Sequence, residues 1–284
     1  MMPQTPKAFQ SGATMKLIHV TDPHLVQPGG SLYGLYPDAR FAAFVDDVNR
    51  SHGDAELCLI TGDLTDLGEA EAYDLFAGEL DRLVMPWRVI LGNHDSRKNF
   101  RARFPACPVD DDGFVQDVVE TSVGTLVLLD TNEPGIAAGR LCERRCAWLG
   151  RQLAAMEGQV MIAMHHPPFD VGIPRLDQIG LQDQAAFAET VLPHRDRIRH
   201  IFFGHVHRPV SGSWQGIGFS TLRATAHQVA LHFDVRESLP GSHEPPAYAI
   251  VLVRDDAVIV HSHDFLDASP RFDMAKYDTK PWPK

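Results

Sequence analysis

No stretch of the 284-residue chain approaches the roughly 20 consecutive apolar residues that a membrane-spanning helix needs. Basic residues are also sparse, since 26 lysines and arginines stand against 37 aspartates and glutamates, and they never form a dense run. The formal net charge of −11 therefore argues against a nucleic-acid groove and against binding to an anionic membrane. The segment 1–14 contains no apolar core of a secretory signal, and we expect it to be a disordered lead-in.

Cysteine is scarce as well. Four cysteines do not make a disulfide framework in a chain of this length, and we expect a cytoplasmic location. Neither a Gly-x-Ser-x-Gly motif nor a phosphate-binding P-loop occurs, so that no serine nucleophile is indicated. Histidine, by contrast, occurs 15 times, and the positions of these histidines carry the functional argument.

Five short apolar runs end in polar residues, which is the pattern of buried strands. Helical patterns lie between them, and this alternation predicts an α/β core with mainly parallel strands. A predicted antiparallel hairpin over 114–120 and 125–130 makes the sheet mixed. The predicted strands of the core are 16–22, 56–63, 87–95, 160–165 and 200–207, and the predicted helices are 38–49, 69–83, 143–156 and 184–192.

The chain beyond residue 207 no longer alternates between strands and helices. Four strand-like segments follow one another there, with connections rich in glycine and proline. The Asp255-Asp256 turn between the last two segments predicts a hairpin. The segments are 210–217, 228–233, 248–253 and 258–263.

Aspartate, asparagine and histidine residues follow every strand of the predicted core. Because the carboxyl ends of parallel strands share one edge of a sheet, functional groups from distant parts of the sequence converge there. Each motif alone has an ordinary explanation as a turn or a buried structural histidine, but all five in this order at strand ends do not. In chain order they are Asp22-Pro23-His24, Gly62-Asp63, Gly92-Asn93-His94-Asp95, His165-His166 and Gly204-His205-Val206-His207.

This set of motifs resembles the calcineurin-like metallophosphoesterase superfamily, whose blocks run D-x-H, G-D, G-N-H-D/E, H and G-H-x-H. The resemblance spans residues 22–207, and no block is missing. It implies the fold of that family, an α/β sandwich of two mixed β-sheets packed face to face and flanked by helices. We expect the metallophosphoesterase domain to cover 15–270 and to be followed by an extended tail over 271–284.

The resemblance also implies two divalent metal ions. Imidazole and carboxylate ligands suit Fe, Mn, Zn or Co, and the absence of a thiolate argues against a purely structural zinc site. Asp63 would bridge the two ions, because a carboxylate offers two oxygens. Carried over by motif position, the first metal is held by Asp22, His24, Asp63 and His207, and the second by Asp63, Asn93, His165 and His205.

With a shared hydroxide the site would carry about one positive charge, which attracts a diester anion. Metals about 3.5–4 Å apart lower the pKa of the water they share, so a metal-bridging hydroxide is the expected nucleophile. By resemblance, His94 lies beside the metals without binding them, and either protonates the leaving oxygen or steadies the phosphoryl charge. Asp95 either orients His94 through a hydrogen bond or caps the helix that follows.

The remaining histidines receive structural roles. His166 is expected to shape its loop rather than bind metal, and His227, His261 and His263 to be structural or surface residues. The segment 25–37 either forms a rim that sorts substrates or is a plain connecting loop.

Further segments resemble two branches of the superfamily. The segments 128–131 (LLDT), 139–141 (GRL) and 148–149 (WL) resemble class III cyclic-nucleotide phosphodiesterases. The segment 165–169 (HHPPF) resembles both these enzymes and the bacterial glycerophosphodiesterases. The implied function is hydrolysis of small, soluble phosphodiesters of the cyclic-nucleotide or glycerophosphodiester type. Related enzymes often form homo-oligomers, and by analogy alone 212–246 is the expected cap or oligomerisation element.

Three alternative functions use the same fold. A phosphomonoesterase or protein phosphatase shares the metal ligands. Against a protein phosphatase, no extra arginines that could clamp phosphate lie near the motifs, although Arg97 and Arg101 follow Asp95 closely. A nuclease would need a basic groove, against which the net charge speaks. A non-catalytic scaffold would have lost a ligand or His94, and this chain retains them all.

Overall fold

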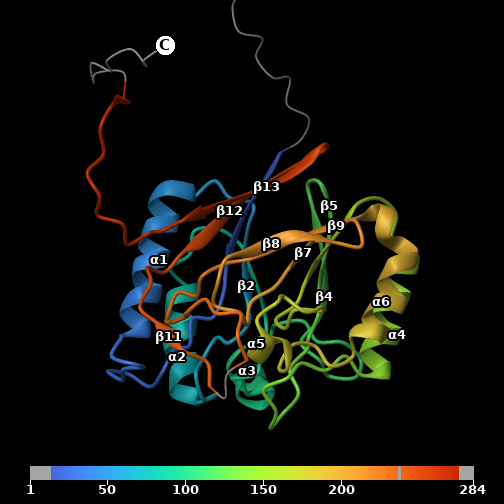
Figure 1. The fold of residues 1–284 in the computed structure, drawn as a ribbon, viewed down its shortest axis with the longest axis horizontal. Coiled ribbons are helices and arrows are strands. Elements are labelled where there is room, and N and C mark those ends of the chain that lie inside the picture. Colours follow the sequence, from blue (N-terminus) through green and yellow to red (C-terminus); the bar gives the residue numbers. More distant parts are fainter. Residues whose placement is uncertain (1–13, 236–237, 275–284) are drawn as a thin grey trace, which may run out of the picture.

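The computed structural model describes residues 14–235 and 238–274. Almost all of the lead-in predicted over 1–14, and most of the tail predicted over 271–284, therefore lie outside the described residues. Two β-sheets pack face to face, with helices on both outer sides (Figure 1). This arrangement confirms the expected α/β fold. Within the described residues, no helix has the length and apolar character to cross a membrane.

The first sheet has five strands in the order β13-β12-β1-β2-β3. Strands β1, β2 and β3 run parallel, whereas β12 pairs antiparallel with both β1 and β13. Helices α1 and α2 lie on its outer side, on the left in Figure 1. The elements of this half are β1 (Met15–Val20), α1 (Pro37–His52), β2 (Leu57–Thr61), α2 (Ala70–Leu80), β3 (Trp87–Ile90), α3 (Arg97–Arg103), β12 (Tyr248–Arg254) and β13 (Ala257–His263).

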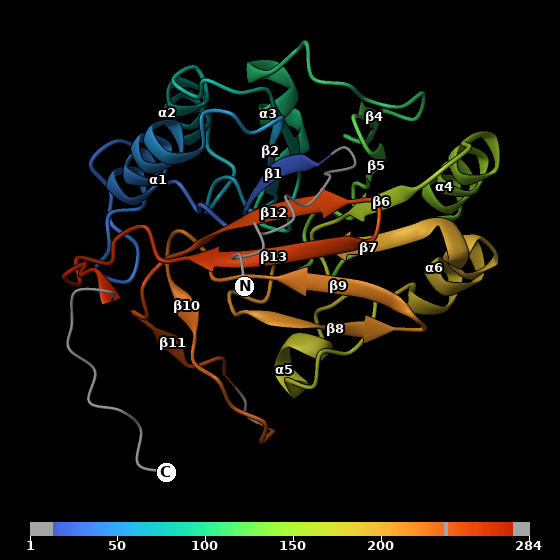
Figure 2. The ribbon, with the colours of Figure 1, turned by 90° about the horizontal axis from the view of Figure 1, so that it is seen from above.

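The second sheet has six strands in the order β4-β5-β6-β7-β9-β8. Strands β5, β6, β7 and β9 run parallel, and antiparallel hairpins add β4 and β8 at its two edges. Helices α4 and α6 lie on the side of the molecule away from α1 and α2 (Figure 2). The elements are β4 (Asp117–Thr121), β5 (Gly124–Leu128), α4 (Glu143–Ala155), β6 (Val160–Ala163), α6 (Gln184–Val191), the 3₁₀ helix η1 (Leu192–Arg197), β7 (Ile198–Phe202), β8 (Val210–Trp214) and β9 (Ile217–Thr221).

Three short elements lie outside the two main sheets. They are the one-turn helix α5 (Pro174–Asp177) and the two-stranded ribbon of β10 (Gln228–Val229) and β11 (Gly241–Ser242).

The apolar pattern of the strands explains this layering. Strands β2 and β6 are buried along their whole length, as central parallel strands covered on both faces must be. On β5, Leu126 and Leu128 join the core that contains the first sheet, while Val127 joins the core under α4 and α6. Side chains of a strand point alternately to its two faces, so one strand contributes to both cores.

Most predicted elements are present, and three differences stand out. The hairpins β4–β5 and β12–β13 are confirmed. The segment 210–217, predicted as one strand, is broken by a turn at Gln215 and Gly216, which both have positive φ and let β8 fold back on β9. Of 228–233, only Gln228 and Val229 form a strand. Helix α3 was indicated only as the helix after Asp95, because a seven-residue helix is too short to show a clear period.

Candidate metal centre

The predicted ligands lie in the loops that leave the parallel strands of both sheets. Backbone hydrogen bonds tie these loops together, because Asp22 N donates to Gly62 O, His24 N donates to Asp63 O and Gly204 N donates to His165 O. These bonds join the loop after β1 to that after β2, and the loop after β6 to that after β7. The loop after β3 joins the first pair through His94 N, which donates to Asp63 Oδ1, and the two sheets are linked by His205 N, which donates to the Asp22 carboxylate. The structure brings all seven predicted ligands into one cluster between the ends of the two sheets, and all of them except the half-buried Asn93 are buried.

The first group consists of Asp22, His24, Asp63 and His207, whose ligand atoms lie within 4.8 Å of one another. His207 Nε2 lies 3.3 Å from Asp22 Oδ1, and His24 Nε2 lies 3.5 Å from Asp63 Oδ2. The two Nε2 atoms of His24 and His207 are 3.1 Å apart. All four residues are buried.

The second group is centred on Asn93. Its Oδ1 lies 3.0 Å from His205 Nδ1 and 3.2 Å from His165 Nε2. His165 Nε2 also lies 3.4 Å from Asp63 Oδ2. Asp63 is thus next to both groups, which is the position that a bridging carboxylate needs.

Hydrogen bonds on the outer side of the rings determine which nitrogens face the cluster. Nδ1 of His165 donates to Thr61 O at 2.7 Å, and Nδ1 of His207 donates to His227 O at 2.8 Å, because carbonyl oxygens only accept. Nδ1 of His24 donates to Asp66 Oδ1 at 3.1 Å. In the neutral form of these three rings, Nε2 is therefore unprotonated and can act only as an acceptor or a metal ligand.

The inner side of the cluster consequently contains acceptors that face acceptors, an arrangement that a cation between them would stabilise. Without a metal the cluster attracts protons: burial lowers the pKa of His165, but the neighbouring Asp63 outweighs burial and raises it to about 9. Burial raises the pKa of Asp63, yet the histidines around it hold that pKa well below its usual range. This donor set fits divalent metal ions.

The backbone of the cluster is strained. Seven described residues other than glycine have positive φ, and six of them belong to this cluster or its surroundings. Such conformations cost of order 1–2 kcal/mol each and persist where the surrounding structure enforces them. The residues are Asp22, His24, Asp63, His205 and His207 among the predicted ligands, Tyr33 beside them, and Gln215 in the β8–β9 turn.

The motif glycines are needed for close approach. A Cβ atom on Gly92 would overlap the Asp63 carboxylate, and a Cβ on Gly62 would overlap the ring of His165. These two glycines thus leave room for a ligand from another loop.

His94 projects from the same loop as Asn93 but is held differently. Its backbone N–H donates to Asp63 Oδ1 at 2.9 Å, and its Nδ1 donates to the backbone carbonyl of Asp66 at 2.6 Å. The Asp66 carboxylate lies 3.7 Å from the same Nδ1. With Nδ1 held in this way, Nε2 of the partly exposed ring is free for a substrate. Asp66 therefore orients both His94 and His24.

Neither role suggested for Asp95 is found. Its buried carboxylate accepts hydrogen bonds from Gly92 N, Leu64 N and the Tyr73 hydroxyl, and none of its described hydrogen bonds reaches His94. The N-cap of α3 is the next residue, Ser96, whose side chain accepts from a backbone N–H of the first turn. Asp95 instead fastens the metal-ligand loop to the loop after β2.

His166 and His227 show how similar histidines differ in role. Both ring nitrogens of His166 are used inside the protein, by the Thr131 hydroxyl at 2.8 Å and the Ala137 carbonyl at 3.2 Å, which agrees with a loop-shaping role. The ring of His227, expected to be a structural or surface residue, packs at a tilt against His207 and His24, with ring centroids 4.7 and 5.1 Å apart. No sequence motif surrounds His227 that could have indicated this position.

A cavity of about 630 Å³ opens over the cluster. Tyr33 and His227 lie on one wall, with ring centroids 4.7 Å apart, so the segment 25–37 does reach the site. The lining also includes the apolar side chains of Leu176 and Ile179. Residues 239–243, within the predicted cap, line the cavity as well. Among the described lining residues there is no lysine or arginine.

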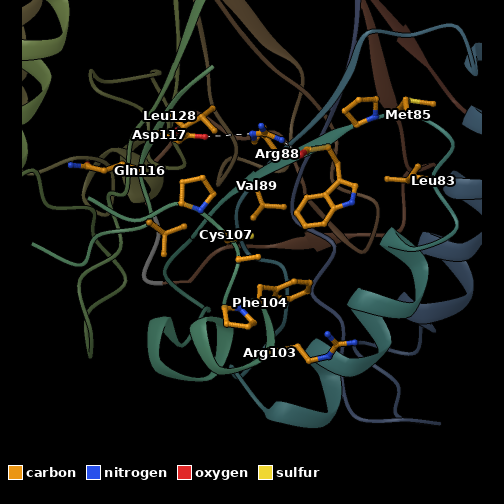
Figure 3. A pocket seen from close by; sticks show the side chains of 16 residues that line it. Leu83, Met85, Arg88, Val89, Arg103, Phe104, Cys107, Gln116, Asp117 and Leu128 are labelled. Carbon is orange, nitrogen blue, oxygen red and sulfur yellow. Dashed lines mark hydrogen bonds and ion pairs between the residues drawn. The ribbon is translucent and has the colours of Figure 1, made fainter. Parts of the chain in front are cut away.

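A second cavity, of about 580 Å³, lies between the edge strands β3 and β4 and is shown in Figure 3. Its walls are mostly apolar, and Arg88 pairs with Asp117 across it at 3.4 Å. Arg103 is paired with Asp74, outside the cavity. Its described residues include no metal-ligating cluster, so the chemistry belongs to the first cavity.

Comparison with known proteins agrees with this geometry. The family model of the calcineurin-like phosphoesterases matches residues 15–209. A "probable cyclic nucleotide phosphodiesterase" of Rhodopseudomonas palustris is 41% identical over 264 residues, covering 92% of this chain and 96% of that protein. A "probable glycerophosphodiester phosphodiesterase" of Arcobacter nitrofigilis is 30% identical, covering 82% and 86%. A dimetal phosphatase structure from Danio rerio has a TM-score of 0.70 at 14% identity, covering 89% and 97%, and supports the fold.

Proposed function

The chain belongs to the calcineurin-like phosphoesterase family, and we propose that it hydrolyses small, soluble phosphodiesters of the cyclic-nucleotide or glycerophosphodiester type. The observation that carries this proposal is the acceptor-only cluster of carboxylates and imidazoles beneath a cavity whose described lining residues include no lysine or arginine. The cluster needs cations, and the walls suit a phosphate with two organic substituents. The names of the two relatives above point to the same substrates.

The residues present would hold two metal ions. Asp22, His24 and His207 would bind the first, Asn93, His165 and His205 would bind the second, and Asp63 would bridge them. When bound, such a metal pair activates water and stabilises charge on the phosphoryl oxygens. Fe, Mn, Zn and Co all suit these ligands.

We assign the protonation of the leaving oxygen to His94. Its Nδ1–H is held by the Asp66 carbonyl, so in the protonated ring Nε2–H points away from that anchor and can donate to the leaving oxygen. The Asp66 carboxylate lies 3.7 Å from the same Nδ1. The same carboxylate accepts from His24, which couples the acid to a ligand of the first metal.

The cavity walls favour diesters over monoesters. Leu176 and Ile179 can cover one substituent of a diester, while the Tyr33 and His227 rings can contact the other. Burial lowers the pKa of His227 to about 2, with the nearby His207 adding to the effect, so that this ring is neutral. Arg97, a candidate phosphate clamp, is bound bidentately to Asp130 at 2.8 and 2.9 Å and is not available.

The test compares bis(p-nitrophenyl) phosphate with p-nitrophenyl phosphate in the presence of Mn, Fe or Zn. Covering about 55 Å² more apolar surface is worth about 1.4 kcal/mol, or about tenfold. The diester should therefore have at least about tenfold higher kcat/KM. A higher kcat/KM for the monoester with every metal would reject the diesterase proposal.

The Asn93→Ala variant should affect the second metal selectively. It removes one neutral oxygen that lies against His165 and His205 but leaves the first group intact. We expect activity to fall at stoichiometric metal and to recover when metal is added in excess. The measurement is a metal titration followed by activity, with Asn49→Ala, which lies on α1 outside the cavity, as the control. Unchanged metal affinity in Asn93→Ala would contradict this role.

We further propose that the protein is a cytoplasmic homo-oligomer that associates through 212–246. Three large apolar side chains are exposed in this segment, Leu231 (54%), Phe233 (69%) and Val235 (80%). The four cysteines are all free, as expected in a reducing compartment.

Phe233→Ser should then shift the mass measured by light scattering toward that of the 31.5 kDa chain. Phe272→Ser, which changes an exposed aromatic residue outside 212–246, is the control. A wild-type protein that is monomeric at all concentrations would reject the interface.

A further inference from the structure

A chain of hydrogen bonds runs from Asp22 into the interior between the two sheets. The Thr21 hydroxyl donates to Asp22 Oδ2 at 2.6 Å, and the Thr61 hydroxyl donates to Thr21 Oγ1 at 2.8 Å. His19 Nε2 lies 2.9 Å from Thr61 Oγ1. All four side chains are 0% exposed, so water does not compete for these bonds.

The donor and acceptor roles along these hydrogen bonds follow from the carboxylate of Asp22, at which they end. A carboxylate only accepts, so the single proton of Thr21 is committed to Asp22 and the single proton of Thr61 is committed to Thr21. The free lone pair of Thr61 must then accept from His19, whose proton is on Nε2. His19 Nδ1 is left as an acceptor, and it is indeed a buried nitrogen without a hydrogen-bond partner among the described residues.

This series of hydrogen bonds determines which oxygen of Asp22 faces the metal cluster. Oδ2 is occupied by the Thr21 hydroxyl, and the backbone N–H of His205 lies 3.2 Å from both carboxylate oxygens and donates between them. Oδ1 is the oxygen that lies 3.3 Å from His207 Nε2 inside the cluster. Thr21 therefore prevents the carboxylate from rotating, and presents one oxygen to the first metal position.

Gly204, the first residue of the Gly-His-Val-His motif, makes room for this contact. An added Cβ would overlap Thr21 Oγ1 and would lie 2.6 Å from Thr61 O and 3.0 Å from Asp22 Oδ2. Any other residue at position 204 would displace the hydroxyl from the carboxylate. The requirement for glycine in this motif is thus explained by Thr21, a residue more than 180 positions away in the sequence.

We propose that Thr21, Thr61 and His19 are positioning residues that raise the affinity of the first metal site by holding the Asp22 carboxylate. The proposal rests on the proposed metal centre, but it does not require that the substrate is a phosphodiester. Removing a hydrogen bond to a metal-ligating side chain typically lowers metal affinity by 10–100-fold.

The test is a calorimetric titration of metal-free protein with Mn²⁺. Thr21→Val should weaken one of the two sites by about 10–100-fold, and Thr21→Ser, which keeps the hydroxyl, should restore it. Thr61→Val should weaken the same site by less, because it removes only the donor to Thr21. In an Asn93→Ala background, in which the intact site contains Asp22, Thr21→Val should weaken that remaining site.

The matched control is Thr225→Val. Thr225 is also fully buried, and its hydroxyl has no hydrogen-bond partner among the described residues, so both Mn²⁺ affinities should stay within about twofold of wild type. Wild-type affinity in both Thr21→Val and Thr61→Val would overturn the proposal, as would an equal loss in Thr225→Val. Thr61→Val does not touch Asp22 and serves if Thr21→Val fails to fold. A wild type that binds two Mn²⁺ but hydrolyses no diester would reject the proposed substrate and leave this inference standing.

Discussion

The Asp63→Ala variant is expected to lose measurable hydrolysis and to bind fewer than two metal ions per chain. Asp63 is buried and lies 3.5 Å from His24 and 3.4 Å from His165, one member of each ligand group. Removing its carboxylate takes a negative charge from both groups at once, so neither metal keeps its full set of ligands. The measurements are metal content by mass spectrometry and turnover of a diester on the same sample.

Two further variants make this result interpretable. Asp63→Asn keeps the volume and an acceptor for the His94 backbone N–H, but it cannot bridge with two anionic oxygens, so we expect nearly the same loss. Asp74→Ala removes an exposed carboxylate on α2 and should behave as wild type. If Asp63→Ala keeps two metals per chain and normal turnover, Asp63 does not bridge.

His94→Ala should retain both metals and lose rate by about 10²–10⁴-fold on natural diesters. The loss should be severe when the leaving group is a glycerol or ribose alkoxide, whose pKa is far above neutrality. It should be mild for p-nitrophenolate, which departs without a proton. A weakened metal site would instead penalise all substrates alike. Comparing the rate loss between alkyl and nitrophenyl diesters, with metal content measured on the same sample, therefore separates an acid from a ligand.

The control for this comparison is His261→Ala, which changes an exposed histidine on β13 outside the cavity. Equal losses for alkyl and nitrophenyl diesters would remove the acid role and leave His94 as a charge stabiliser. Loss of metal in His94→Ala would make it a ligand.

The order of strands and helices was predictable because apolar periodicity is a local property. The central strands are short apolar runs that end in a polar motif. Most of their observed first and last residues lie within three residues of the predicted bounds, for β1, β2, β3, β6 and β7. The predicted strands were wrong where the structure depends on contacts between residues far apart in the sequence, or where a segment is too short to show a clear apolar pattern. Gln215 and Gly216 turn β8 onto β9 inside an apparently continuous strand, and Leu231 and Phe233 have the pattern of a strand but are exposed.

The sequence by itself determined the chemical types at the site and their order along the chain. Asp, Asn and His at five strand ends predict a metal centre, because parallel strands deliver their carboxyl ends to one edge. The convergence of Asp22 and Asp63 with His165 and His205 required no knowledge of side-chain packing beyond that rule. The resemblance to the metallophosphoesterase motifs, rather than this rule, placed His94 beside the metals.

Only the tertiary structure decided which groups support that centre. The carbonyl of Asp66, rather than the carboxylate of adjacent Asp95, holds His94, because the turn after β3 points the Asp95 side chain into the protein. Likewise His227 reaches the cavity, and Thr21 fills the space that Gly204 leaves. These contacts depend on how two sheets pack and where loops cross. No periodicity or motif encodes them, because each joins residues whose spacing along the chain is unrelated to their distance in space.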